Sequence, residues 1–83
     1  MVKNEFNILL NTIEKVKNFV EKVLTIEQDV DIKVGRYVID AKSILGIFSI
    51  DLMREMICKI HSEDKETCEN FEQLIKEFII WYV

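Results

Sequence analysis

The apolar residues of this chain follow two different periods, and the order in which these periods alternate limits the possible folds most strongly. Runs with a two-residue period predict half-buried strands, and runs with apolar residues at i, i+3, i+4 and i+7 predict amphipathic helices. Along the chain, the runs give the order strand, helix, strand, strand, helix, strand, helix. Strands that share one apolar face need cover on that face. The pattern therefore predicts a two-layer α+β sandwich, with the helices on one face of the sheet.

Four segments alternate between apolar and polar residues, as strands do. The predicted strands cover residues 5–10, 30–34, 37–41 and 56–61. Gly35 and Arg36 separate the second and third strands, and a two-residue connection of this kind predicts a β-hairpin. The uncovered face of the sheet is expected to carry polar residues that meet water. These residues are Asn7, Asp31, Lys33, Asp40 and Lys59.

Three segments have the spacing of amphipathic helices. The predicted helices cover residues 12–24, 44–50 and 64–82. Asn11 followed by Glu14 resembles a capping box at the start of the first helix, and Ser43 is the N-cap candidate of the second. The apolar stripe of the first helix consists of Ile13, Val16, Phe19, Val20 and Val23. Ile80 and Trp81 fall on the polar side of the last helix, where they either form an interaction surface or cover a sheet edge.

The length and composition indicate one folded domain. A chain of 83 residues can bury about 60% of its unfolded surface, which suffices for one hydrophobic core. Its 49% apolar and 31% charged residues are typical of a globular protein. The sequence has no proline, two glycines and no repeat that would mark a linker. Residues 1–83 are therefore expected to form a single domain.

Two classes of partner find no support in the sequence. The net charge of -4 and the thin spread of 11 basic residues argue against nucleic-acid binding. No apolar run approaches the roughly 20 residues of a membrane-spanning helix, and the chain does not start with an apolar signal segment. We therefore expect a cytoplasmic protein without membrane insertion.

The residues that most often carry chemistry are few and scattered. Cys58 and Cys68 lie in predicted ordered segments, where two buried reduced thiols are expected. Since His61 is the one histidine, the sequence has no dense set of zinc ligands, and neither a metal nor a cofactor is expected. No nucleophile and base, and no phosphate-binding glycine loop, occur at a recognisable spacing. The chain is predicted not to be an enzyme, and no small-molecule substrate is evident.

Five consecutive residues, Lys42-Ser43-Ile44-Leu45-Gly46, connect the sequence to a known family. With their flanking residues they resemble a segment of HPr, the histidine-containing phosphocarrier of the sugar phosphotransferase system. In that segment a hairpin strand runs into Lys-Ser-Ile-Met-Gly and the helix of the regulatory serine. The order of elements and the spacing from the first helix to the serine also agree over almost the whole chain. The resemblance implies an open-faced β-sandwich, with antiparallel strands in the order 1-4-2-3 and three helices on one side.

The same resemblance exposes a departure at the family's active site. Family phosphocarriers open the first helix with Gly-(Ile/Leu)-His-Ala-Arg-Pro-Ala. Counted back from the serine, this sequence places Thr12 at the histidine, Ile13 at the alanine, Glu14 at the arginine and Lys15 at the proline. A phosphothreonine is a stable ester, and Glu14 reverses the charge of the family's guanidinium. His61 is predicted at the opposite end of the sheet, so histidine-based phosphate transfer is not expected.

By the same resemblance, Ser43 is the candidate regulatory site. The family serine is modified by the ATP-dependent HPr kinase/phosphorylase, and here Lys42 would lie beside the phosphate. A phosphate at the start of a helix interacts favourably with exposed amides, so the modification is compatible with the fold. The alternative is that Ser43 acts only as an N-cap, which contributes about 1 kcal/mol to stability.

The short helix after the serine is the candidate partner-binding surface. In the family it presents apolar side chains to enzyme I, to the kinase and to the catabolite-control repressor. Ile44, Leu45 and Phe48 are the corresponding candidates here, together with Lys42 as a partner-binding residue, and Ile47 and Ile50 are expected to be buried. The alternative is ordinary packing of all of these residues.

The sequence thus predicts an HPr-like, non-catalytic regulatory module. It would bind protein partners of the phosphotransferase or carbon-catabolite network, with phosphorylation of Ser43 as the switch. The alternative is a descendant of the HPr fold, retained for a structural or assembly role without phosphorylation.

Overall fold

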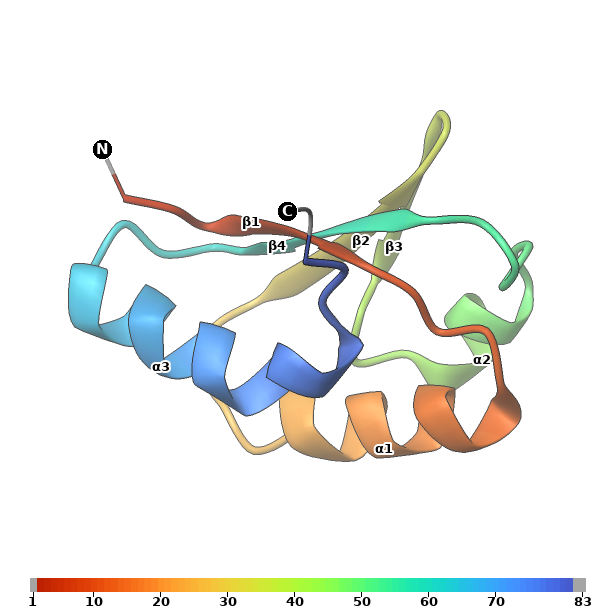
Figure 1. Ribbon diagram of the computed structural model, residues 1–83, viewed down its shortest axis with the longest axis horizontal. Helices are drawn as coiled ribbons and strands as arrows, with labels where there is room; N and C mark the ends of the chain where they lie inside the picture. Colours follow the sequence, from red (N-terminus) through yellow and green to blue (C-terminus); the bar gives the residue numbers. More distant parts are fainter. Residues whose placement is uncertain (1, 82–83) are drawn as a thin grey trace.

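One antiparallel sheet organises the structure, a computed structural model that describes residues 2–81 (Figure 1). Its strands lie in the order β1-β4-β2-β3, which confirms the predicted order. The bounds are β1 (Glu5–Ile8), β2 (Val30–Val34), β3 (Tyr37–Asp40) and β4 (Met56–Ile60). Each is as long as predicted or one to two residues shorter. In the register, Ile8 lies opposite Met56, and Cys58 lies opposite both Phe6 and Ile32.

Alternation of side chains separates a core face of the sheet from an open face. The core face carries residues that are at most 3% exposed, namely Phe6, Ile8, Val30, Ile32, Val34, Met56, Cys58 and Ile60. The open face carries the predicted polar residues, of which Asp31 and Lys59 are half-buried and Asn7, Lys33 and Asp40 are exposed. The expected two-layer arrangement is therefore present.

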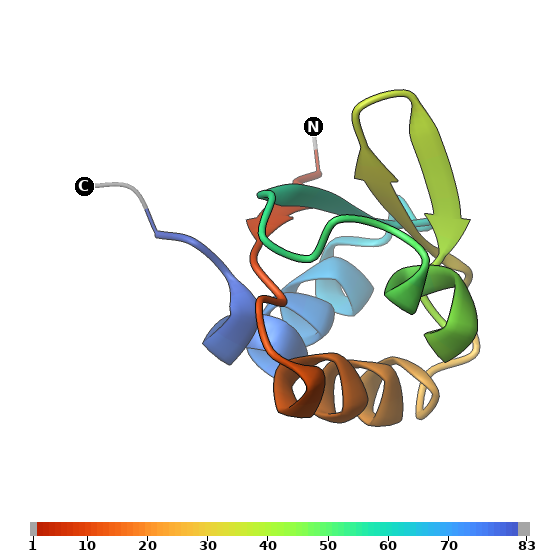
Figure 2. The same ribbon diagram turned by 90° about the vertical axis from the view of Figure 1, so that its right-hand side faces the viewer.

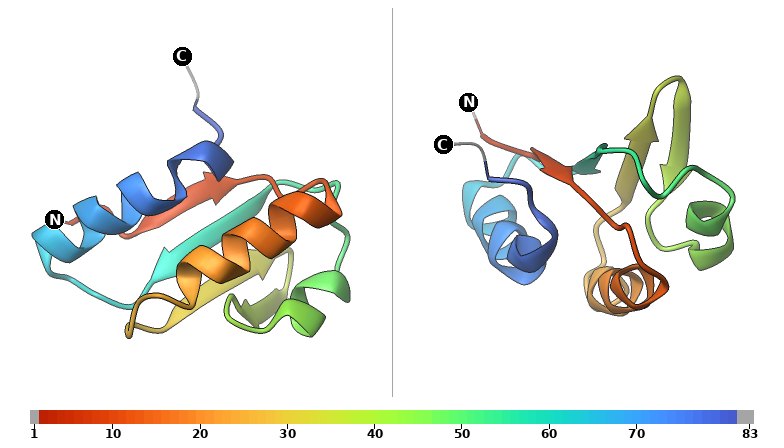
Figure 3. Two further views of the ribbon diagram at one scale, coloured as in Figure 1. Left: turned by 90° about the horizontal axis from the view of Figure 1, so that it is seen from below. Right: turned by 45° about the vertical axis from the view of Figure 1, so that its right-hand side comes forward.

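Three α-helices cover the core face: α1 (Ile13–Val23), α2 (Ile44–Phe48) and α3 (Lys65–Ile75) (Figure 3). The buried stripe of α1 consists of Val16, Phe19, Val20 and Val23. Ile13, which the sequence pattern assigned to this stripe, is 64% exposed. It is the first helical residue and lies beyond the edge of the core. α3 buries Cys68, Phe71 and Ile75 against the other half of the sheet.

The predicted N-cap of α1 is wrong by one residue. Thr12 has extended backbone angles, and its hydroxyl accepts a hydrogen bond from the Lys15 amide at 3.1 Å. Glu14 is therefore the second helical residue and not the third, which is the position a capping box requires. The Asn11 side chain instead accepts a hydrogen bond from the Lys15 ammonium at 3.1 Å.

The predicted last helix is too long. α3 ends at Ile75, a 3-10 turn, η1 (Lys76–Phe78), follows, and the chain then becomes extended. The backbone of this extended segment pairs with β1 and its continuation: Leu9 donates to the Phe78 carbonyl at 3.1 Å, and Ile80 donates to the Asn7 carbonyl at 2.8 Å. These hydrogen bonds to the open edge of β1 take the place of the helical hydrogen bonds that the segment would make if α3 continued. The last predicted helical position, Tyr82, lies outside the described residues.

This C-terminal extension, residues 79–81, gives Ile80 the edge-covering role that was one of the two considered for Ile80 and Trp81. Ile79 forms a β-bridge with Ile8 and is buried, and Ile80 is half-buried beside it. The segment therefore covers the edge of the sheet along β1. Trp81 remains 56% exposed, with its ring centroid 6.0 Å from the Lys3 ammonium.

The hairpin between β2 and β3 projects beyond the rest of the sheet (Figure 2). Gly35 in its turn has a φ of +59°, the left-handed region that a side chain disfavours. Within residues 2–81, none of the helices is long and apolar enough to cross a membrane.

Candidate functional site

The start of α1 and the whole of α2 lie at the same end of the molecule (Figures 1 and 3). β1 leads into Thr12, and β3 leads through Ala41 and Lys42 into Ser43. This end therefore contains the predicted partner-binding and regulatory residues and the position that the family resemblance assigns to the histidine.

Ser43 is an exposed N-cap, as the sequence predicted. Its hydroxyl accepts a hydrogen bond from the Gly46 amide at 3.2 Å. Gly46 itself allows α2 to approach the sheet, since a Cβ atom there would lie 2.9 Å from Cγ2 of Ile39 and 3.2 Å from the Ser43 hydroxyl oxygen. Ser43 of the Lys-Ser-Ile-Leu-Gly segment thus caps α2, and Gly46, which lacks a Cβ atom, leaves the room for α2 to lie close to Ile39 of β3.

Lys42 has a structural role that the sequence did not predict. Its ammonium donates a hydrogen bond to the Ile26 carbonyl at 2.8 Å, and its backbone amide donates to the Asp40 carboxylate at 2.9 Å. The side chain is half-buried. Lys42 therefore links the start of α2 to the loop that follows α1, and its charge is already satisfied in the unmodified protein.

The apolar side chains of α2 divide into a buried and an exposed group. Ile47 is fully buried, whereas Leu45 is 80% and Phe48 is 38% exposed. Ile44 is half-buried and packs on the core, so its predicted place in the exposed group is only partly correct. Ile50, predicted to be buried, is half-buried as well. We refer to Leu45 and Phe48 as the α2 patch.

Two further exposed apolar residues lie on the elements that flank α2. Ile13 at the start of α1 is 64% exposed, and Met53 in the segment between α2 and β4 is 72% exposed. Neither residue was predicted to belong to an exposed surface. The exposure of Met53 could have been predicted, because it lies in the short segment between α2 and β4 and the core residues of both elements had already been identified.

The N-terminal turn of α1 contains neither an imidazole nor a guanidinium. The Thr12 hydroxyl caps the helix, the Lys15 ammonium is hydrogen-bonded to Asn11, and Glu14 is exposed. One cation and one carboxylate in the first turn give no net positive charge for a phosphate. The assignment of Thr12, Glu14 and Lys15 to a degenerate active site stays a prediction from the resemblance.

His61 lies at the other end of the sheet. β4 runs antiparallel to β1 with Met56 opposite Ile8, so the residue after β4 is far from the end of β1 that leads into α1. Its Nε2 atom is 2.6 Å from an oxygen of the Asp31 carboxylate. The predicted position of this histidine as an exposed residue at a strand end is confirmed.

The two cysteines are buried free thiols. Desolvation by burial, with a smaller effect of the Asp31 charge, raises the pKa of Cys58 to about 12. The thiol is therefore neutral at physiological pH and is a poor nucleophile. Within residues 2–81, no group of three or more His, Cys, Asp and Glu side chains is placed to hold a metal ion.

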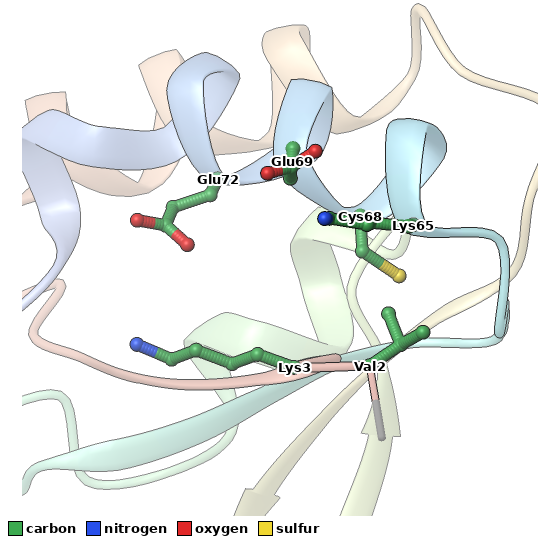
Figure 4. Close-up of a pocket in the computed structure, with 6 residues that line it drawn as sticks. All are labelled: Val2, Lys3, Lys65, Cys68, Glu69 and Glu72. Carbon is green, nitrogen blue, oxygen red and sulfur yellow. The ribbon is translucent and has the colours of Figure 1, made fainter.

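A hollow of about 500 Å³ separates the N-terminal segment from α3 (Figure 4). Its lining residues are Val2, Lys3, Lys65, Cys68, Glu69 and Glu72. The Lys3 ammonium also lies 5.1 Å from the centroid of the Phe6 ring. Two lysines and two glutamates give the hollow no preference for one sign of charge, and none of the predicted site residues lines it.

Comparison with known proteins identifies the fold. The sequence matches no protein-family model and no curated protein. Among solved structures, it is similar to the crystal structure of HPr-C-His from Thermoanaerobacter tengcongensis, with a TM-score of 0.70 over 93% of this chain and 91% of that chain. The two sequences are 17% identical, so the likeness establishes an HPr-like fold. The function has to be argued from the residues.

Proposed function

We propose that this chain is an HPr-like, non-catalytic module that binds protein partners of the phosphotransferase or carbon-catabolite network in the cytoplasm, and that phosphorylation of Ser43 controls this binding. The observation that carries the proposal is the exposed Ser43 hydroxyl at the start of a helix whose next turn presents the α2 patch. The HPr-like fold supports the link to the phosphotransferase system.

A partner-binding role suits the exposed surface at this end of the molecule. Leu45 and Phe48 expose apolar area without any charged residue on α2, and Ile13 and Met53 expose more on the flanking elements. Buried apolar area of this kind supplies much of the binding energy at protein interfaces. A partner that covers the α2 patch would also cover Ser43.

A histidine phosphocarrier is not proposed, because the chemistry is missing from the start of α1. Thr12 would form a stable phosphate ester, and Glu14 would repel the phosphate. The one imidazole, His61, is paired with Asp31 at the other end of the sheet. Partner binding is therefore the role that the residues support.

A phosphate on Ser43 would change the surface in two ways. It adds a charge of about -1.5 to -2 next to an uncharged apolar patch, which opposes the burial of that patch against a neutral or acidic partner. It also competes with the Ile26 carbonyl for the Lys42 ammonium. Because α2 has only five residues, the local amides and Lys42 matter more here than a helix dipole.

The first experiment is a pair of phosphorylation reactions on the purified chain, one with HPr kinase/phosphorylase and ATP, the other with enzyme I and phosphoenolpyruvate. Intact and peptide mass spectrometry then locates any phosphate. The proposal predicts one phosphate on Ser43 in the first reaction and none in the second. Ser43→Ala should abolish it, whereas Ser49→Ala, at the other end of the same helix, should not.

The opposite results separate the proposal from its alternatives. No phosphate in either reaction refutes the switch and leaves an HPr-fold protein with a structural or assembly role. The hydrogen bond from the Lys42 ammonium to the Ile26 carbonyl favours that alternative, because it gives Lys42 a structural role that needs no phosphate on Ser43. Phosphate from phosphoenolpyruvate that is lost in His61→Gln would instead identify an unexpected carrier.

A further inference from the structure

A second hollow, of about 370 Å³, is lined by residues of the β2–β3 hairpin and of the segment that connects α2 to β4. We call it the hairpin groove. None of its lining residues belongs to the α2 patch or to the start of α1. Its volume is within the range of small-molecule sites, which begins at about 300 Å³.

The hairpin groove has an apolar floor and an aromatic wall. Val34 is buried at 3% exposure, and Ile39 and Ile50 are half-buried. Tyr37, from the first residue of β3, lines the groove and is 64% exposed. The floor and the ring together can accept an apolar body of a few carbon atoms and shield it from water.

The guanidinium of Arg54 lies on one side of the hairpin groove. Arg54 packs over the hairpin turn, since a Cβ atom built on Gly35 would lie 3.6 and 3.8 Å from its two terminal nitrogens. Across residues 2–81, no carboxylate lies within 4.0 Å of this guanidinium. The planar group can therefore offer two parallel N–H donors to a carboxylate or phosphate.

The other polar residues of the groove are already occupied. One oxygen of the Asp51 carboxylate accepts the Met53 amide at 3.0 Å, which holds this side chain within its own turn. The Ser49 hydroxyl donates to the Gly46 carbonyl at 2.6 Å. Asp51 reduces the positive potential without pairing with Arg54, so an inorganic anion alone would bind weakly. An anion that also buries apolar surface gains both contributions.

We propose that the hairpin groove binds a small organic anion, a carboxylate or phosphate monoester with an aromatic or branched apolar body. The anionic group pairs with Arg54, and the body lies on Val34 and Ile50 against the Tyr37 ring. This site does not depend on the proposed function of Ser43.

The test is an NMR titration of the full chain, which follows the backbone amide signals. The probes are phenyl phosphate, benzoate, inorganic phosphate as the anion alone, and benzyl alcohol as the apolar body alone. The proposal expects saturable shifts of the Val34, Tyr37 and Ile50 signals with phenyl phosphate or benzoate. Inorganic phosphate and benzyl alcohol should bind at least about tenfold more weakly, since each lacks one contribution. The better of the two aromatic anions shows whether the groove prefers phosphate or carboxylate.

Two arginines give a matched pair of variants. Arg54→Gln should weaken binding of the preferred probe about tenfold or more, because it removes a charge-assisted contact. Arg36→Gln removes the same charge from the hairpin turn outside the groove and should leave binding unchanged. Both side chains are exposed, so both variants should keep the wild-type spectrum away from the substitution.

Three results would overturn the inference. If Arg54→Gln and Arg36→Gln weaken the binding of the aromatic anion equally, the binding depends only on the overall positive charge and not on a specific contact with Arg54. Shifts that centre on the hollow beside α3 would place the ligand elsewhere. Absence of saturation by both aromatic anions at the groove residues would show that the groove is not a site for this class. A positive or negative outcome leaves the phosphorylation test of Ser43 unaffected.

Discussion

Replacement of Gly46 by alanine tests whether the close approach of α2 to β3 is a real steric constraint. In an unconstrained helix, Gly→Ala stabilises by roughly 0.5–1 kcal/mol, because glycine loses more backbone entropy on folding. Here the new Cβ atom would lie 2.9 Å from Cγ2 of Ile39, a methyl group on a stiff β-branched side chain. Overpacking of this kind typically costs about 1–3 kcal/mol. We therefore expect Gly46→Ala to reduce the free energy of unfolding by about 1 kcal/mol.

The contact with Ile39 can be isolated by a double-mutant cycle. Ile39→Ala removes the methyl group that meets the new Cβ atom, so in that background Gly46→Ala should stabilise by about 0.5 kcal/mol. Urea denaturation followed by far-ultraviolet circular dichroism gives the free energy of unfolding of all four proteins. In thermal unfolding, a loss of 1 kcal/mol lowers the Tm by about 4–8 °C in a domain of this size. If Gly46→Ala stabilises the wild-type background, the reasoning is refuted.

Two further substitutions test the hydrogen bond of the Lys42 ammonium and the raised pKa of the Cys58 thiol. Lys42→Met removes the hydrogen bond from the ammonium to the Ile26 carbonyl and should lower the free energy of unfolding by about 1–2 kcal/mol. Lys65→Met, at an exposed position of α3, should change it little. Equal effects of the two substitutions in urea titrations would argue against a stabilising link through Lys42. The pKa of Cys58 rises from 9.0 to about 12 on folding, so its contribution to stability is full below pH 9 and is lost as the pH rises through this interval. The slope is about 1.4 kcal/mol per pH unit. Cys58→Ala should be less stable overall but should lack this loss, and identical slopes for both proteins would contradict the assignment.

The elements that could be predicted from the sequence are those whose own residues determine them. The strands alternate over a sheet with one covered face, and the α1 stripe has a full helical period, so a local pattern was sufficient. The last helix failed because the apolar spacing continues through Phe78 and Ile79. Their backbone, however, lies beside the free edge of β1, which competes with the helix for the same hydrogen bonds. A local pattern cannot report an edge more than 60 residues away in the chain.

The candidate site shows the same limit. Ser43 as an N-cap and Leu45 as an exposed residue follow from their own helix, and both were predicted. The role of Lys42 depends on a carbonyl 16 residues earlier. The hairpin groove depends on Arg54 folding back over the turn at Gly35, which no periodicity encodes.

The pairing of the C-terminal extension with β1 also determines what a spectroscopist would observe during unfolding. Trp81 is the only tryptophan and lies on this extension, which pairs with β1 through one β-bridge made by two backbone hydrogen bonds. Its emission therefore reports the release of the extension, while circular dichroism reports the loss of the sheet and helices. If the extension detaches first, the two signals have different midpoints although the core unfolds in one step. That difference would resemble a folding intermediate, and it would in fact measure the strength of one strand edge.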